Sequence, residues 1–253
     1  MRYLVGLILV GLVSCQPSVE VADTPDTPDM PDTPDMTEFL DPVKADGEHY
    51  ALEFENDYVR VLRENLAAGD GGAMHSHRDR VSVYLNDSEV TIKPRGGDPV
   101  DVTLVAGTTS WGEATTHQGF ARGNIENLSI ELWDLTGEDI PLPEPDAVEV
   151  DPEHHIVDFE NDRVRVVRMI YPPGSKTPLH AHRIGFGVFL SDAHGQNILA
   201  EGEDAVEIEA KAGSTFWTAG QPEQPAHVTE NLGDEDMVVV LVEFKKRPRS
   251  APE

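Results

Sequence analysis

The sequence predicts an all-β protein built from two similar units in tandem. Short β-branched and apolar runs are broken by Gly, Pro, Asp and Asn, with little of the 3.6-residue periodicity of helices. In addition, the tetrapeptide Phe54–Asp57 returns as Phe159–Asp162, 105 residues later. An internal repeat of this period indicates two units of about 100 residues, each large enough to form its own core.

The N-terminus has the features of a secretory signal, because Arg2 precedes a short apolar run, Leu4–Val13, that cannot span a bilayer. The residues ending at Cys15, Leu-Val-Ser-Cys, resemble a bacterial lipobox. That resemblance implies cleavage before Cys15 and lipid attachment to its sulfur, with an ordinary cleaved signal as the alternative. Gln16 follows in place of an aspartate, which favours the periplasmic side of the outer membrane or the cell surface. Since Cys15 is the only cysteine, the folded units must be stable without a disulfide.

The amino-acid composition predicts the remaining segments of the chain. A Thr-Pro-Asp tract follows Cys15 and predicts an extended, disordered tether, because proline opposes helix and the aspartates repel one another. The net charge of -28 argues against a nucleic-acid partner, so the membrane is expected as a partner only through the lipid. We divide the chain into a signal peptide (1–14), a tether (15–46), a first unit (47–137), a proline-rich acidic linker (138–150), a second unit (151–246) and a tail (247–253).

Each unit is predicted to hold many short antiparallel strands, as in a sandwich or a closed barrel. In the first copy the β-branched runs place strands near 51–54, 59–64, 80–84, 90–93, 100–104 and 125–135. In the second copy they place strands near 156–159, 164–170, 186–190, 206–209 and 237–244.

The repeat also carries a pair of histidines in each copy. His75 and His77 lie six and eight residues after a glycine, and His180 and His182 occupy the same places in the second copy. Residues two apart on a strand face the same way, so each pair of imidazoles converges on one point. Neutral imidazole is a good ligand for divalent transition metals, which need at least a third protein ligand to be held firmly.

A candidate third ligand lies downstream in each copy. In the second copy it is His227, ten residues after Trp217. In the first copy, alignment on Trp111 selects His117, whereas alignment on the Asn-Leu pairs places Gly123 there. The first site is therefore less firmly predicted than the second.

These motifs resemble those of the cupin superfamily. Its first motif is a glycine, five residues, His-x-His and then a glutamate, and its second motif ends in His-x-x-x-Asn, as in His227 to Asn231. The resemblance covers both repeats and implies two tandem double-stranded β-helix (jelly-roll) barrels, with three histidines inside each barrel. Cupins often pair, so a homodimer is also consistent with it.

The chain departs from the family at the glutamate. No acid stands at Val81 or Ser82 in the first copy, or at Phe186 or Gly187 in the second. Three neutral histidines would leave a bound iron, zinc, nickel or manganese ion its full charge and open positions, which resembles the three-histidine thiol and diketone dioxygenases. The resemblance thus implies a metal-dependent, oxygenase-type enzyme on a small organic substrate. A non-catalytic binding or structural module at the cell envelope stays open as the alternative.

Two arginines occupy equivalent positions, Arg63 and Arg168, each on the strand face of two valines. If that face lines the barrel interior, each could hold a substrate carboxylate through a bidentate pair. A salt bridge with the abundant acids is the alternative that we favour. The remaining large or titratable residues receive no site role: Trp111 and Trp217 are predicted to be core residues, and His49, His154, His155 and His194 to be surface or loop residues.

Overall fold

The computed structural model describes residues 38–199 and 205–249, and residues from Phe39 onward form one compact unit. The predicted signal peptide, Cys15 and the Thr-Pro-Asp tract lie outside the described residues. Within the described part of the chain, no helix is long and apolar enough to cross a membrane.

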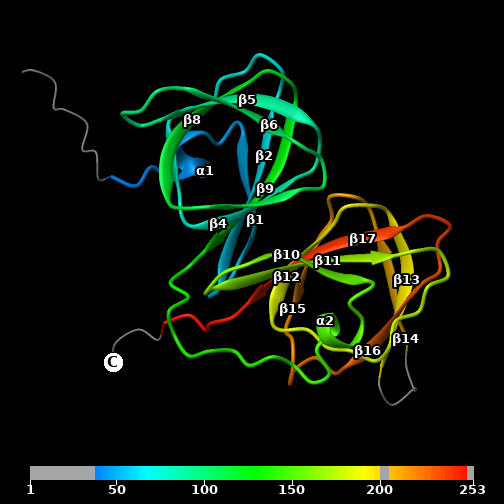
Figure 1. Cartoon of the computed structure of the whole chain (residues 1–253). Helices are drawn as coiled ribbons and strands as arrows, with labels where there is room; N and C mark the ends of the chain where they lie inside the picture. Colours follow the sequence, from blue (N-terminus) through cyan, green and yellow to red (C-terminus); the bar gives the residue numbers. More distant parts are fainter. Residues whose placement is uncertain (1–37, 200–204, 250–253) are drawn as a thin grey trace, which may run out of the picture. The chain divides into compact units, whose positions relative to one another are not determined.

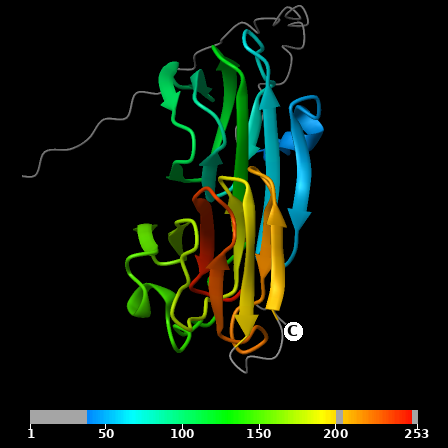
Figure 2. The same cartoon turned by 90° about the vertical axis from the view of Figure 1, so that its right-hand side faces the viewer.

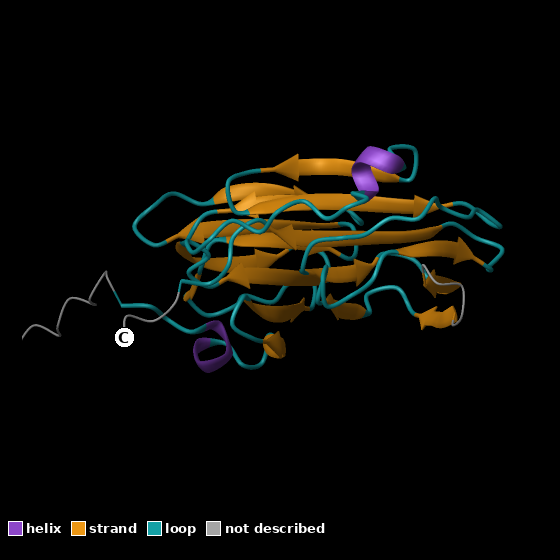
Figure 3. Ribbon diagram, turned by 90° about the horizontal axis from the view of Figure 1, so that it is seen from below, coloured by secondary structure: helices purple, strands orange, loops and turns teal. Residues whose placement is uncertain are grey.

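The fold is all-β, as predicted, and residues 38–199 and 205–249 contain only two short helices (Figures 1 and 3). The first copy consists of α1 (Pro42–Ala45), β1 (Tyr50–Glu55), β2 (Val59–Leu66), β3 (His75–His77), β4 (Arg80–Tyr84), β5 (Ser88–Pro94), β6 (Val100–Leu104), β7 (Thr109–Gly112), β8 (Thr115–Ala121) and β9 (Ile125–Leu132). The second copy consists of α2 (Ala147–Val150), β10 (His155–Glu160), β11 (Val164–Tyr171), β12 (Gly185–Phe189), β13 (Ala193–Leu199), β14 (Ala205–Ala210), β15 (Thr215–Thr218), β16 (His227–Asn231) and β17 (Met237–Phe244).

Each copy contains two antiparallel sheets, as expected of a jelly roll. The strand orders are β1-β2-β9-β4-β7 and β3-β8-β5-β6 in the first copy. They are β10-β11-β17-β12-β15 and β14-β13-β16 in the second. Figure 2 shows the strands of the two copies from the side. The predicted pair of tandem barrels is therefore confirmed.

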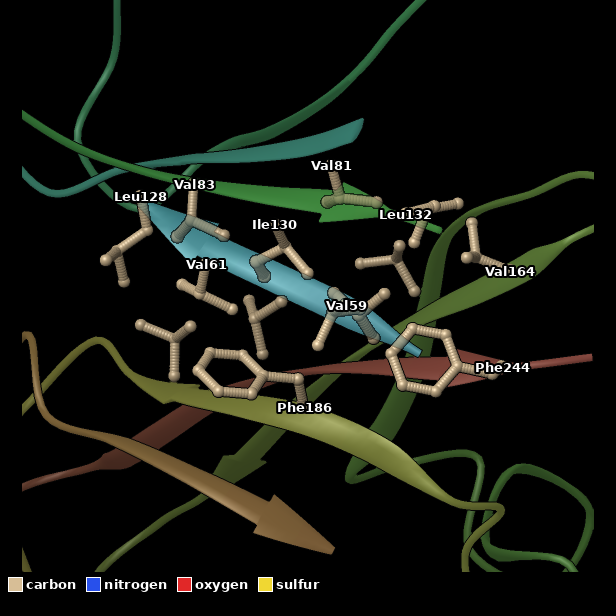
Figure 4. Close-up of a cluster of buried hydrophobic side chains, with 14 of the residues drawn as sticks. Val59, Val61, Val81, Val83, Leu128, Ile130, Leu132, Val164, Phe186 and Phe244 are labelled. Carbon is tan, nitrogen blue, oxygen red and sulfur yellow. The ribbon is translucent and has the colours of Figure 1, made fainter. Parts of the chain in front are cut away.

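The two faces of the five-stranded sheets have different neighbours. On β2, Val59 and Val61 point to one face and pack in a fully buried cluster with Phe186 and Phe244 of the second copy (Figure 4). The alternate residues of β2, such as Glu64, point the other way and line the first barrel's interior. The core that joins the copies is thus built from the outer faces of both barrels.

Trp111 and Trp217 pack against this joining core, as predicted. Trp217 stacks on Phe54 and lies beside Tyr58, and Trp111 carries the guanidinium of Arg163 over its ring at 4.9 Å.

The ordered fold includes parts of the segments expected to be tether, linker and tail. Helix α1 lies within the last residues assigned to the tether, and Asp41 caps it. Ile140, expected in the linker, is buried in the joining core, and its backbone N–H donates to the carbonyl of Lys245. The amide of Arg247, the first residue assigned to the tail, donates to the Glu138 carbonyl. Backbone pairing therefore holds these polar stretches in place.

Candidate metal centres

The first cluster of histidines lies inside the N-terminal barrel. Strand β3 pairs with β8 so that His75 stands opposite His117, and His77 follows two residues along the same face. All three side chains are buried, and one ligand atom from each lies within 4.8 Å of the others. This register makes His117, and not Gly123, the third member of the cluster.

Hydrogen bonds orient two of these imidazoles. Nδ1 of His75 lies 2.8 Å from the carbonyl oxygen of Ala73, so that nitrogen must carry the proton. Nδ1 of His77 lies 2.7 Å from a carboxylate oxygen of Glu131. The two Nε2 atoms then face each other at 3.0 Å. Two nitrogens bound at about 2.1 Å to one ion, at a right angle, would be about 3.0 Å apart, so the pair fits a shared metal.

The second cluster has the same construction in the C-terminal barrel. His180 forms a β-bridge with His227, the counterpart of the pairing between His75 and His117. The His180 ring lies 4.6 Å from that of His227 and 5.0 Å from that of His182, measured between centroids. The rings of the predicted trio therefore lie together in this barrel too, but the ligand atoms that lie within 4.8 Å of one another are those of His155, His180 and His182.

Two buried ring nitrogens of the second cluster have no hydrogen-bond partner among the described residues, Nε2 of His180 and Nδ1 of His182. Nδ1 of His180 lies 2.9 Å from the Pro178 carbonyl oxygen, which fixes the proton on Nδ1. Its Nε2 is buried and has no hydrogen-bond partner among the described residues. An unpartnered buried lone pair is costly, and a metal ion would satisfy it.

A fourth histidine, His155, joins this cluster, and the prediction that it is a surface or loop residue is wrong. Its side chain is fully buried, and its ligand atom lies within 4.8 Å of those of His180 and His182. However, both of its nitrogens already have partners: Nδ1 lies 3.1 Å from the Asp151 carbonyl and Nε2 3.0 Å from the Tyr171 hydroxyl. We therefore keep His227 as the third ligand, because its place in the fold matches His117.

The other histidines without a site role lie where they were expected. His49 and His154 each contact the aspartate three residues earlier, and His194 is exposed.

A buried glutamate stands behind each cluster, and sequence reasoning missed both. Glu131 on β9 and Glu243 on β17 are fully buried. Glu131 contacts His77, as described above, and an oxygen of Glu243 lies 3.4 Å from Nδ1 of His182. A carboxylate behind a ligating histidine orients the ring and raises its basicity. A sequence signal was present in the second copy, where Glu243 is the single acid in the otherwise apolar strand Met237–Phe244. In the first copy β9 also contains Glu126, Asn127 and Ser129, so Glu131 does not stand out.

Packing explains why the family's own glutamate is absent from the second copy. A Cβ on Gly187 would lie only 2.2 Å from the ring of Phe216. Phe216 therefore fills the space into which a side chain from position 187 would extend, and the acid reaches the cluster from β17 instead.

The interiors favour neutral imidazoles. Burial lowers the pKa of every histidine of both trios and of His155. The pKa falls to about 3 for His117 and to about 2 for His180. Burial raises the pKa of Glu131 to about 7 and also raises that of Glu243, against the pull of Arg165. Uncharged imidazoles are the form that binds a metal.

The arginines predicted for substrate binding do not line the interiors. Arg63 shares the outer face of β2 with Val59 and Val61, pairs with Glu53 at 2.6 Å and donates to the carbonyl of Gly213. Arg168 pairs with Asp158 at 2.6 Å. Their strand face packs between the barrels, so the carboxylate-holding role is wrong and the salt-bridge alternative holds.

The cavities beside the two clusters differ in size. In the second barrel His182 and His227 border a cavity of about 400 Å³, with Trp217 and Phe216 among its walls. In the first barrel His77 and His117 border a cavity of about 80 Å³. The second site alone has room beside its histidines for an organic molecule of several rings.

Comparison with known proteins supports the fold. No family model matches the sequence, and no curated protein matches it. Among solved structures, AerE from Microcystis aeruginosa is similar over 78% of this chain and 93% of its own, with 14% identity and a TM-score of 0.51. Oxalate decarboxylase of Bacillus subtilis matches 77% of this chain and 70% of its own, with 15% identity and a TM-score of 0.49. A cupin domain from Bordetella pertussis is 27% identical over 36% of this chain and 91% of its own, with a TM-score of 0.31. The chain thus has two jelly-roll domains in tandem, and each holds a buried three-histidine cluster consistent with a divalent metal.

Proposed function

We propose that each barrel binds one divalent transition metal through its three histidines, and that the C-terminal barrel acts as an oxygenase-type enzyme on a small organic substrate. The observation that carries the proposal is the orientation of His75 and His180. In both, a backbone carbonyl holds the proton on Nδ1, so Nε2 presents a lone pair to the cluster. Buried lone pairs converging from three imidazoles suit a cation and little else.

The residues of the second barrel then have separate tasks. His180, His182 and His227 would hold the ion, and Glu243 would orient His182 while Arg165 balances its charge. A metal held by three neutral ligands supplies Lewis acidity and open positions for ligands. The cavity beside His182 and His227 would receive the substrate next to the ion. A dioxygenase reaction adds both atoms of O₂ to the substrate and so needs no external reductant.

The alternative is a metal-bearing but non-catalytic binding module. One observation favours it: polar side chains around the second cavity are paired with one another, as in Thr218 with Gln224 and Thr229 with Asn197. Oxygen uptake in the presence of a bound organic ligand distinguishes the two, because a binding module consumes no O₂.

Metal analysis tests the proposal. We expect untagged protein to carry close to two divalent ions per chain and the His180→Ala variant close to one, because two remaining imidazoles hold an ion weakly. His194→Ala is the matched control, since His194 is exposed, and it should keep both ions. Metal near zero in the parent protein, with no thermal shift on adding iron, zinc, nickel or manganese, would exclude a metalloenzyme.

We further propose that the mature protein is anchored through Cys15 to the envelope membrane, by the lipobox resemblance of the residues ending at Cys15. Radioactive palmitate fed to expressing cells should label the parent protein. The Cys15→Ser variant should take up no label and should leave the membrane fraction. If that variant is still labelled, the acylation site is elsewhere.

A further inference from the structure

The interiors of the two barrels can be compared position by position, because the strand pairings are equivalent. Glu64 stands opposite Asn127 in the first barrel, where Met169 stands opposite Val239 in the second. The other strands of each five-stranded sheet are also paired in equivalent registers.

At each of these matched interior positions a polar residue of the first barrel is replaced by an apolar or smaller residue in the second. Ser129 stands opposite the second residue after Arg60, and Leu241 stands opposite the second residue after Arg165. Because Arg60 and Arg165 are equivalent, Ser129 corresponds to Leu241. The remaining matched pairs, taken from the pairings of β4, β7, β12 and β15, are Arg80 with Gly185, Ser82 with Gly187, Tyr84 with Phe189 and Ser110 with Phe216. Apart from the glutamate and arginine behind the histidines, these matched positions of the five-stranded sheet carry no charged group in the second barrel. Glu207 and Glu209, on the other sheet, also border its cavity.

On the other sheet too, a side chain that borders the cavity of the second barrel is smaller than its counterpart in the first barrel. Leu104 on β6 corresponds to Ala210 on β14, because their partners Ser88 and Ala193 are equivalent. Leu104 is buried in the first barrel's core, whereas Ala210 lines the larger cavity of the second. The smaller side chain at 210 leaves room that the first barrel lacks, whereas the space beside Gly187 is filled by the ring of Phe216.

The apolar wall reaches the metal ligands. Phe216, Val239 and Leu241 border the same cavity as His182 and His227. An anionic ligand would lose its hydration against this wall, and no arginine or lysine among the described residues lines the cavity to compensate it. Glu207 and Glu209, which also border the cavity, would repel an anion further. An uncharged ligand would instead gain about 25 cal/mol for each Å² of apolar surface that it buries.

We infer that the C-terminal barrel binds an uncharged, largely apolar molecule of one or two rings beside its histidines, and that the N-terminal barrel does not. This inference rests on the proposed function for the location of the site, and it adds the chemical class of the substrate. The first barrel, with its small cavity and Arg80 among the lining residues, has room only for water or a few heavy atoms. The two centres therefore serve different purposes.

The test uses the protein without its signal peptide and lipid anchor, loaded with cobalt or iron. Three uncharged probes are added: 2-naphthol, indole and cyclohexanone. Malonate and succinate serve as small dianions. We expect at least one uncharged probe to bind with one molecule per chain, and both dianions to bind at least tenfold more weakly. The inference fails if no uncharged probe binds or if a dianion binds more tightly.

Two variants locate the probe. Ala210→Leu gives the second barrel the side chain of the first and should weaken probe binding at least tenfold. Ala205→Leu makes the same change on the same strand at an exposed position and should leave binding unchanged. Unaltered binding in Ala210→Leu would place the probe outside the cavity and overturn the inference.

Metal content measured in the same samples separates this inference from the proposed function. If both ions are bound but the uncharged probes are excluded, the substrate class is wrong and the metal centres remain. If the probes bind in the cavity but no metal does, the apolar site remains and the metalloenzyme is excluded.

Discussion

The metal-free protein is expected to unfold in mild acid, between about pH 6 and pH 4. Seven histidines are buried in the two barrels, and burial lowers the pKa of each below its ordinary value of 6.5. Below pH 6.5 the unfolded chain binds protons that the folded chain refuses, so stability falls as the pH falls. Each such group contributes about 1.4 kcal/mol per pH unit, and several together exceed a typical stability of about 5–15 kcal/mol.

The buried glutamates act in the opposite direction but are fewer. The pKa of Glu131 is raised to about 7 and that of Glu243 is also raised. The folded chain therefore keeps protons that the unfolded chain loses above pH 4.5, and these groups restore stability as the pH falls from 7 towards 4.5. For Glu131 the gain is about 3 kcal/mol at most, which is less than the loss from seven histidines.

Urea unfolding followed by circular dichroism from pH 7.5 to pH 4.5 measures this balance. We expect metal to shift the acid transition to lower pH, because a bound ion excludes protons from the imidazoles. His155→Gln should reduce the slope of the unfolding free energy against pH, and His194→Gln, an exposed control, should leave it unchanged. A metal-free protein that stays folded at pH 4 would contradict the account of the buried clusters.

Replacement of Arg165 by methionine is expected to destabilise the protein by about 3–5 kcal/mol. The guanidinium of Arg165 is buried and donates to Glu243 at 2.6 Å and to Asp146 at 2.6 Å and 3.1 Å. Without it, two buried carboxylates lose their counter-charge. Although burial alone would raise the pKa of Asp146, its hydrogen bond with Arg165 keeps that pKa below its ordinary value.

Arg168→Met is the matched control, because Arg168 lies on the same strand and pairs with Asp158 at a more exposed position. The side chains of Arg168 and Asp158 are 20% and 17% exposed, against 7% and 5% for Arg165 and Asp146. Water can reach the carboxylate that remains, so this variant should lose clearly less stability than Arg165→Met. Equal losses in the two variants would show that Arg165 is not the central cation of a buried network.

Much of the fold could be predicted because the repeat and the turn residues are local signals. The strands that were missed, among them β8, β13 and β16, contain histidine, glycine, glutamine or asparagine in place of continuous β-branched or apolar runs. Their conformation is fixed by pairing with neighbours, as in β13 with β14 and β16. Such pairing depends on residues far apart in the sequence, and propensity does not report it.

In the candidate sites too, some residues can be predicted from local sequence and others are placed only by tertiary structure. The His-x-His pairs follow from spacing alone, whereas His155 reaches the second cluster only because β10 pairs with β11 beside Tyr171. For Arg63 the period of two placed the side chain on the correct face, the one with Val59 and Val61. Which face lines the barrel and which packs against the other copy is decided by tertiary structure.

Anomalous diffraction from crystals of the untagged protein, grown with the metal that it retains, tests the central claim most directly. Our account predicts two peaks per chain, one within bonding distance of His75, His77 and His117 and one within bonding distance of His180, His182 and His227. Metal peaks only at surface carboxylates, or none at either cluster after soaking in iron, zinc, nickel or manganese, would contradict it.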